Sequence, residues 1–257
     1  MAHTRHELRI DGRALSYVDF GGDGTPLVAL HGHMSEGASF AQVAGALGDG
    51  YRVIAPDQRG HGDSDRAAEY GREGYLSDVL ALLDHLGLER VVLLGHSLGG
   101  INAYQFAARH PERVSALVDI DGCAEIPDGP TPLAFVLGFP VTAPTREELL
   151  AGLGPAAPVL AGVLRENADG TWRLPFHPRD MVDSEGLVHG DHWADWTGSD
   201  CPALLIRGTK GVVPQAQAAE MIARRPGARL VEFDTDHFVY AAEPAGVAAA
   251  VREFLAR

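Results

Sequence analysis

Short runs of consecutive apolar residues recur along the chain, and most precede a longer stretch whose apolar positions have helical spacing. The runs lie at residues 27–30, 52–55, 91–94, 116–120, 203–206 and 229–233. Apolar runs without alternation are typical of parallel strands that are covered on both faces. Helices are predicted between them, at residues 75–86, 101–109, 212–224 and 243–255. This order predicts an α/β fold with a mostly parallel sheet and helices on both faces.

Two parts of the chain depart from this alternation. Residues 7–10 and 14–20, joined by Asp11-Gly12-Arg13, predict an antiparallel hairpin at the edge of the sheet. Between residues 122 and 199 the alternation stops, and prolines and all three tryptophans of the chain occur there. We therefore expect a core of residues 1–121 and 200–257, with residues 122–199 inserted as a lid. Lid helices are expected near residues 146–153 and 178–188.

Composition and charge narrow the classes of function. Hydrophobic residues make up 46% of the 257 residues, enough for a sizeable core, and the formal net charge is -14. An acidic surface repels phosphate groups, so neither nucleic acid nor an anionic membrane is expected as a partner. Two cysteines and scattered histidines form no metal-ligand pattern, so no metal and no cofactor is expected.

The chain has no apolar signal segment at its start and no run of about 18 apolar residues. We expect a cytoplasmic protein, a monomer or homodimer, that acts on a small molecule.

The strongest chemical signal is the segment Gly95-His96-Ser97-Leu98-Gly99. A Gly-x-Ser-x-Gly pattern arises easily by chance, but here it directly follows a predicted strand and precedes a predicted helix, as a nucleophile elbow requires. Glycine flanks the serine because the turn is sharp. The start of the helix favours developing negative charge. The sequence therefore predicts Ser97 as the nucleophile.

A second glycine-containing segment, His31-Gly32-His33, follows the strand at residues 27–30. Glycine lets the backbone approach the reacting group closely. The amides of His33 and Leu98 are therefore the expected oxyanion hole. For the His33 side chain two interpretations stay open: it covers the mouth of the site, or it takes a direct part in the chemistry.

In the order of its motifs, the chain resembles the α/β-hydrolase fold family along nearly its whole length. The resemblance rests on His31-Gly32, on the loop of residues 57–64 (DQRGHGDS), on the Ser97 motif and on Asp236-His237-Phe238. It implies that His237 is the general base for Ser97. It also implies that the loop of residues 57–64 is structural.

One position departs from the family pattern. The triad acid usually lies in a segment resembling Gly-x-x-Asp-x-x-x-Pro, but here Gly211 occupies its place, with Lys210 beside it. Asp121 ends the strand that should neighbour the nucleophile strand, so it emerges at the same sheet edge as Ser97. Haloalkane dehalogenases and zearalenone lactonase resemble this arrangement. We predict Asp121 as the acid, with the deeper Asp119 as a weaker alternative.

Aromatic residues of the lid are candidates for the substrate pocket, although packing within the lid would explain them equally well. They are Phe135, Phe139, Trp172, Phe176, Trp193 and Trp196. A serine at the elbow favours acyl transfer, so the predicted activity is hydrolysis of an ester, lactone or thioester of a small to medium apolar substrate. Carbon–carbon bond hydrolysis, lyase chemistry, a cofactor-free oxygenase and a non-catalytic ligand receptor remain alternatives.

Overall fold

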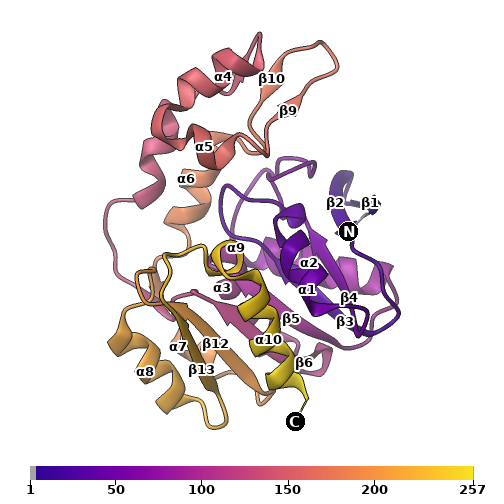
Figure 1. Ribbon diagram of the computed structural model, residues 1–257, viewed down its shortest axis with the longest axis vertical. Helices are drawn as coiled ribbons and strands as arrows, with labels where there is room; N and C mark the ends of the chain where they lie inside the picture. The colour runs from indigo at the N-terminus through magenta and orange to yellow at the C-terminus, as the bar shows by residue number, and fades with distance from the viewer. Residues whose placement is uncertain (1–3, 257) are drawn as a thin grey trace.

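An eight-stranded sheet forms the centre of the computed structural model, which describes residues 4–256 (Figure 1). Its spatial order is β1-β2-β4-β3-β5-β6-β12-β13. The strands are β1 (Thr4–Ile10), β2 (Arg13–Asp19), β3 (Thr25–Leu30), β4 (Tyr51–Pro56), β5 (Val91–His96), β6 (Val114–Ile120), β12 (Ala203–Gly208) and β13 (Arg229–Phe233). β1 and β2 form an antiparallel hairpin at one edge, and β2 also pairs antiparallel with β4. The other pairs are parallel, which confirms the predicted fold class.

Helices cover both faces of this sheet because neighbouring strand residues point to opposite sides. Leu93 belongs to one buried cluster, while Val92 and Leu94 belong to the other. The first cluster includes residues of α2 (Arg72–His85), α3 (Leu98–Arg109) and α8 (Gln215–Arg224). The second includes η1 (Gly37–Phe40), α1 (Ala41–Leu47), α9 (Val239–Ala242) and α10 (Pro244–Leu255). The sequence analysis did not predict α1, which is too short to show a clear period.

The segment between β6 and β12 consists of short elements and has a small hydrophobic cluster of its own. The buried members of that cluster run from Val136 to Met181 in sequence. In Figure 1, α4, α5, β9 and β10 stand away from the sheet, above the rest of the chain. The elements are β7 (Glu125–Ile126), η3 (Pro132–Gly138), β8 (Thr142–Ala143), α4 (Arg146–Leu153), η4 (Gly154–Ala156), α5 (Ala157–Leu160), β9 (Arg165–Glu166), β10 (Trp172–Arg173), α6 (Pro178–Gly186), β11 (Gly190–Asp191) and α7 (Trp193–Trp196). We call residues 125–191 the lid.

Strand register decides which residues meet at the carboxyl edge of the sheet. Leu30 of β3 lies opposite Gly95 of β5, and Gly95 lies opposite Asp119 of β6. The residues that follow these strands therefore lie side by side at one edge, beneath the lid. Within residues 4–256, none of the helices has both the length and the apolar character that crossing a bilayer demands.

Candidate active site

Ser97 lies at the sharp turn between β5 and α3. Its backbone adopts φ 54° and ψ -118°, a conformation that is uncommon for a residue with a side chain. A Cβ at Gly95 would lie 2.0 Å from the carbonyl oxygen of Gly99, and a Cβ at Gly99 would lie 2.1 Å from that of Leu30. Both glycines are therefore required by close packing. The turn presents the serine at the first turn of α3, where the amides lack intrahelical acceptors.

His237 and Asp121 form the hydrogen bond that the strand positions predict. The distance from His237 Nδ1 to Asp121 Oδ2 is 2.8 Å. His237 lies in the loop between β13 and α9, and together with Ser97 it lines a single cavity. A carboxylate on Nδ1 holds the imidazole with its other nitrogen free to accept a proton.

Asp121 is fully buried, and the backbone around it is arranged to receive its carboxylate. Oδ2 also accepts a hydrogen bond from the amide of Val212 at 2.8 Å, and Oδ1 accepts one from Gly208 at 3.3 Å. A Cβ at Gly211 would lie 2.1 Å from Asp121 Oδ2. Asp121 therefore occupies the space that a side chain at position 211 would need, which explains why that position holds glycine.

The weaker candidate, Asp119, lies deeper in the sheet and does not reach the imidazole. Its Oδ1 accepts a hydrogen bond from the Gly122 amide at 3.1 Å, and its Oδ2 has no partner among the described residues. Burial, with the nearby Asp121, raises the pKa of Asp119 well above its usual range. Lys210 points elsewhere and forms an exposed ion pair with Asp234 at 3.0 Å.

The loop after β3 is held beside Ser97 by buried hydrogen bonds. His31 Nε2 accepts the Gln58 amide at 2.9 Å, and the Gln58 side chain donates to the His31 carbonyl. A Cβ at Gly32 would lie 3.1 Å from the Ser97 Cβ, so the loop passes close to the nucleophile. Across residues 4–256, the amide of His33 has no hydrogen-bond acceptor. This free amide and that of Leu98 are suited to binding a negatively charged oxygen.

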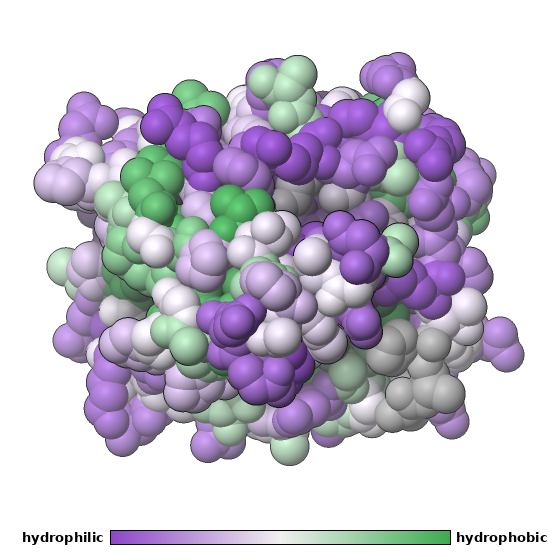
Figure 2. All heavy atoms as spheres, turned by 90° about the horizontal axis from the view of Figure 1, so that it is seen from above, coloured by the Kyte–Doolittle hydropathy of each residue, from purple (hydrophilic) through white to green (hydrophobic). Residues whose placement is uncertain are grey.

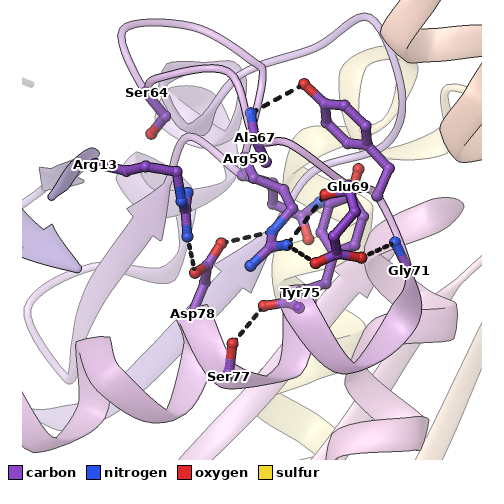
Figure 3. A network of polar contacts seen from close by, with 12 residues as sticks. Arg13, Arg59, Ser64, Ala67, Glu69, Gly71, Tyr75, Ser77 and Asp78 are labelled. Carbon is purple, nitrogen blue, oxygen red and sulfur yellow. Dashed lines mark hydrogen bonds and ion pairs between the residues drawn. The ribbon is translucent and has the colours of Figure 1, made fainter. Parts of the chain in front are cut away.

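The loop of residues 57–64 is tied to the core by ion pairs. Arg59 donates to Asp78 of α2 at 2.8 Å and to Glu69 at 2.7 Å, and Arg13 donates to the same Asp78 (Figure 3). The Asp57 carboxylate accepts hydrogen bonds from the backbone amides of Gly37 and Asp63. These side chains therefore support the loops around the site without lining the cavity.

The cavity above Ser97 has a volume of about 510 Å³ and is mostly apolar. Apolar lining residues come from the core and from both ends of the lid segment; they include Met34, Ile101, Ile126, Leu133, Val188, Val212 and Phe238. Figure 2 shows the lid end of the molecule, where hydrophobic side chains gather in one region of a largely hydrophilic surface. No cluster of three or more histidines, cysteines or acidic residues suited to a metal ion occurs in the described part of the chain.

The six aromatic residues predicted to line this cavity lie elsewhere. The cavity lining includes none of Phe135, Phe139, Trp172, Phe176, Trp193 and Trp196. Three of them pack within the lid cluster, and Phe135 is 55% exposed beside Phe139. The last two belong to the core, where Trp196 packs edge-on against Tyr104 of α3. Five of the six aromatic residues therefore pack against a hydrophobic cluster, but their presence in the sequence did not indicate which surface each ring packs against.

The structure adds cavity residues that the sequence analysis did not single out. Glu125 and Glu185 are acidic lining residues, and burial raises the pKa of Glu185. Cys123 also lines the cavity, and burial, with Asp119 and Asp121 nearby, raises the pKa of its thiol to about 12. His96, inside the serine motif, shares a hydrogen bond of 2.9 Å with the His237 carbonyl. Only His96 lies inside a recognisable sequence motif, because the other three belong to no motif that the sequence shows.

Comparison with known proteins assigns the chain to a family. A family model described as the alpha/beta hydrolase fold matches residues 25–244, so the chain belongs to this family. A 3-hydroxybutyrate-oligomer hydrolase of Cupriavidus necator is 30% identical, covering 93% of this chain and 92% of its own length. A 2-(acetamidomethylene)succinate hydrolase of Mesorhizobium japonicum is 29% identical, covering 96% and 94%. The solved enol-lactonase from Burkholderia xenovorans LB400 has a TM-score of 0.80 and 25% identity, over 98% of this chain and all of that one. The family and these relatives are consistent with a hydrolytic enzyme.

Proposed function

We propose that the protein is a serine hydrolase that cleaves a carboxylic ester, lactone or thioester through an acyl-enzyme on Ser97. The observation that carries the proposal is the hydrogen bond of 2.8 Å between His237 and the fully buried Asp121. His237 lines the same cavity as Ser97. A serine, a histidine and a carboxylate in these roles are the parts that acyl transfer needs.

The reaction runs in two steps on this arrangement. His237 takes the proton of the Ser97 hydroxyl as its oxygen attacks the substrate carbonyl, and Asp121 stabilises the imidazolium. The amides of His33 and Leu98 bind the resulting oxyanion. The intermediate collapses, and His237 gives the proton to the leaving group. Water, deprotonated by His237, then attacks the acyl-enzyme, and His237 gives that proton to the Ser97 oxygen as the acid is released.

The cavity favours a neutral, apolar substrate of small to medium size. Its lining is mostly apolar and includes no lysine or arginine, but it does include Glu125 and Glu185. The names of an oligomer hydrolase and an enol-lactonase among the relatives fit an ester or lactone. The name of the succinate-derivative hydrolase fits less well, since a second carboxylate on the substrate would meet acidic side chains.

A non-catalytic receptor is the main alternative of another class. Its support was the glycine in the usual acid position, and the contact of Asp121 with His237 removes that reason. Carbon–carbon bond hydrolysis and lyase chemistry would use the same residues, so substrate turnover must separate them.

The test combines an ester series with a probe for the nucleophile. p-Nitrophenyl esters from acetate to octanoate are incubated with the wild type and with Ser97→Ala, and a fluorophosphonate probe is applied to both. We expect turnover and labelling of Ser97 in the wild type and neither in the variant. Equal turnover by both proteins, or a wild type that is neither active nor labelled, would overturn the proposal.

A further inference from the structure

The His33 side chain lines the cavity and is joined to the lid. Its Nε2 lies 2.9 Å from Oγ of Ser184, a fully buried residue of α6. Burial, with the nearby His61 and Arg72, holds the pKa of His33 well below its usual range. The ring is therefore neutral at neutral pH and carries one proton, on one of its two nitrogens.

The neighbours of Ser184 decide which nitrogen carries that proton. The Tyr75 hydroxyl lies 2.9 Å from Ser184 Oγ, and Tyr75 is 1% exposed. Arg72 also lies beside this hydroxyl but can only donate, so Ser184 Oγ is the acceptor for the Tyr75 proton among the described residues. To avoid leaving its proton unbonded in the interior, Tyr75 donates to Ser184. Ser184 then donates its own proton to His33 Nε2. The proton of the imidazole is consequently on Nδ1, for which the described residues provide no hydrogen-bond acceptor, while Nε2 is the nitrogen bonded to Ser184.

Arg72 places a positive charge beside Ser184 and Tyr75. It is mostly buried, yet no carboxylate of the described chain pairs with it, whereas Arg59 on the same side has two (Figure 3). Its guanidinium lies over the Tyr75 ring at 4.6 Å and donates to Ser184 Oγ at 3.3 Å. A largely buried cation without a carboxylate partner is costly, and negative charge that forms nearby would lower this cost.

A second chain of hydrogen bonds leads from Arg72 to the same loop. Arg72 donates to Asn102 Oδ1 at 3.0 Å, Asn102 donates to Gln58 at 2.8 Å, and Gln58 donates to the His31 carbonyl. The loop of residues 31–33 is thus held from two sides by donors that originate at one cation. Developing negative charge at the site is the natural counterpart of such an arrangement.

We propose that the His33 imidazole is a third donor to the oxyanion, through Nδ1–H, beside the amides of His33 and Leu98. Ser184 and Arg72 are positioning residues that fix the proton on Nδ1 and orient the ring. No proton is transferred in this role: the N–H bond stays intact while the charge on the oxygen forms and disappears. The inference rests on the proposed serine hydrolase function and adds a residue to it.

The main experiment compares His33→Leu, which removes the donor, with His33→Asn, which places an amide N–H near the position of Nδ1. Both are measured for kcat and KM on a p-nitrophenyl ester and for inhibition by a trifluoromethyl ketone, which forms an oxyanion on the attacking serine. For His33→Leu we expect kcat and ketone affinity to fall together, by about 100-fold, with KM nearly unchanged. For His33→Asn we expect most of both losses to be recovered.

The positioning role is tested with Ser184→Ala, and Ser77→Ala serves as a control. Ser77 is an exposed residue of α2 whose hydroxyl bonds only to the Gly74 carbonyl. We expect about a tenfold loss of kcat in Ser184→Ala, with KM close to that of the wild type and a lower melting temperature because the Tyr75 proton loses its acceptor, and no loss in Ser77→Ala. A loss in Ser184→Ala that appears only in KM or in melting temperature would overturn the positioning role.

Three other outcomes overturn the inference. Unchanged kcat in His33→Leu would show that the imidazole lines the cavity but donates no hydrogen bond to the oxyanion. Equal losses of kcat in His33→Leu and His33→Asn would show that the size and shape of the His33 side chain matter, and that its N–H group does not. If the wild type is neither active on esters nor labelled at Ser97, the proposed function itself fails. If it is active and labelled while His33→Leu matches it, only the role of His33 fails.

Discussion

The carboxylate of Asp121 and a side chain at position 211 would compete for one space beside His237. This follows from the distance of 2.1 Å between a Cβ at Gly211 and Asp121 Oδ2. The backbone of Asp121 has φ 53°, in the left-handed region where glycine is favoured, while Gly211 has no positive φ. The two positions can therefore exchange glycine and aspartate without new backbone strain at either.

We predict that the acid can be moved back to the position usual in the family. Asp121→Gly should lower kcat by about 10³- to 10⁴-fold, because the imidazole loses its partner. Gly211→Asp alone should also be impaired, since its side chain meets Asp121. The double variant Asp121→Gly/Gly211→Asp should recover at least tenfold over Asp121→Gly. Ester kinetics on the four proteins measure this cycle.

Lys210→Ala is the matched control for this cycle, because Lys210 adjoins position 211 but pairs only with the exposed Asp234. It should keep the activity of the wild type. Wild-type activity in Asp121→Gly, or no recovery in the double variant while it remains folded, would show that the acid is misassigned.

Asp119 gives a prediction about stability rather than catalysis. Its folded-state pKa is raised above the unfolded value of about 4, so folding takes up a proton. The free energy of unfolding must then fall as pH rises from about 4 through the folded pKa. Asp119→Asn keeps an acceptor for the Gly122 amide and removes this dependence. We expect it to be more stable than the wild type by about 1 kcal/mol or more at pH 8, and by less at pH 5.

Urea unfolding at the two pH values checks this, with the exposed Asp128→Asn as the control. A variant whose stability relative to the wild type is the same at pH 5 and pH 8 would contradict the assignment of a raised pKa to Asp119.

At the scale of elements, α6 connects the lid to the core. Asp180 in its first turn accepts two hydrogen bonds from Arg66, at 2.7 and 2.8 Å, and one from the Tyr70 hydroxyl at 2.6 Å. The same helix carries Ser184 and the cavity residue Glu185. Its attachment therefore affects both the shape of the cavity and the loop after β3.

We predict that Asp180→Asn loosens this attachment without unfolding the core. Backbone hydrogen exchange should become faster in residues 178–186, and KM for an ester should rise several-fold. Asp183→Asn is the control, because Asp183 pairs with Arg179 on the exposed side of the same helix. Equal exchange rates in the two variants would contradict a special role for the Asp180 contacts.

The elements also show how far sequence patterns reach. The central parallel strands were predictable because they are mostly apolar on both faces, and Asp121 was predictable because a strand end fixes its position. The positions of the lid aromatics were not predictable, because an aromatic residue in a sequence indicates burial but does not indicate which surface it packs against. The contacts among His33, Arg72 and Ser184 join residues far apart in the chain, and no local period or motif connects them.

At the scale of the whole molecule, charge should select the substrate. The chain has a net charge of -14, and its cavity presents Glu125 and Glu185 with no lysine or arginine in the lining. A substrate that brings a carboxylate into this mostly apolar cavity meets like charge, which opposes its binding. The wild type should therefore hydrolyse p-nitrophenyl butyrate with at least tenfold higher kcat/KM than p-nitrophenyl hemisuccinate.

Glu185→Gln should lower the ratio of kcat/KM for the butyrate ester to that for the hemisuccinate ester by about tenfold, equivalent to about 1.4 kcal/mol. The preference of the wild type should also shrink as pH falls, because the raised pKa of Glu185 means that its charge is lost at a higher pH than for an ordinary glutamate. Glu147→Gln, on the exposed face of α4, changes the net charge equally but lies outside the cavity. If Glu147→Gln narrows the preference as much as Glu185→Gln, the selection comes from the overall field of the protein. If only Glu185→Gln does so, it comes from the cavity, as we expect from the position of its carboxylate.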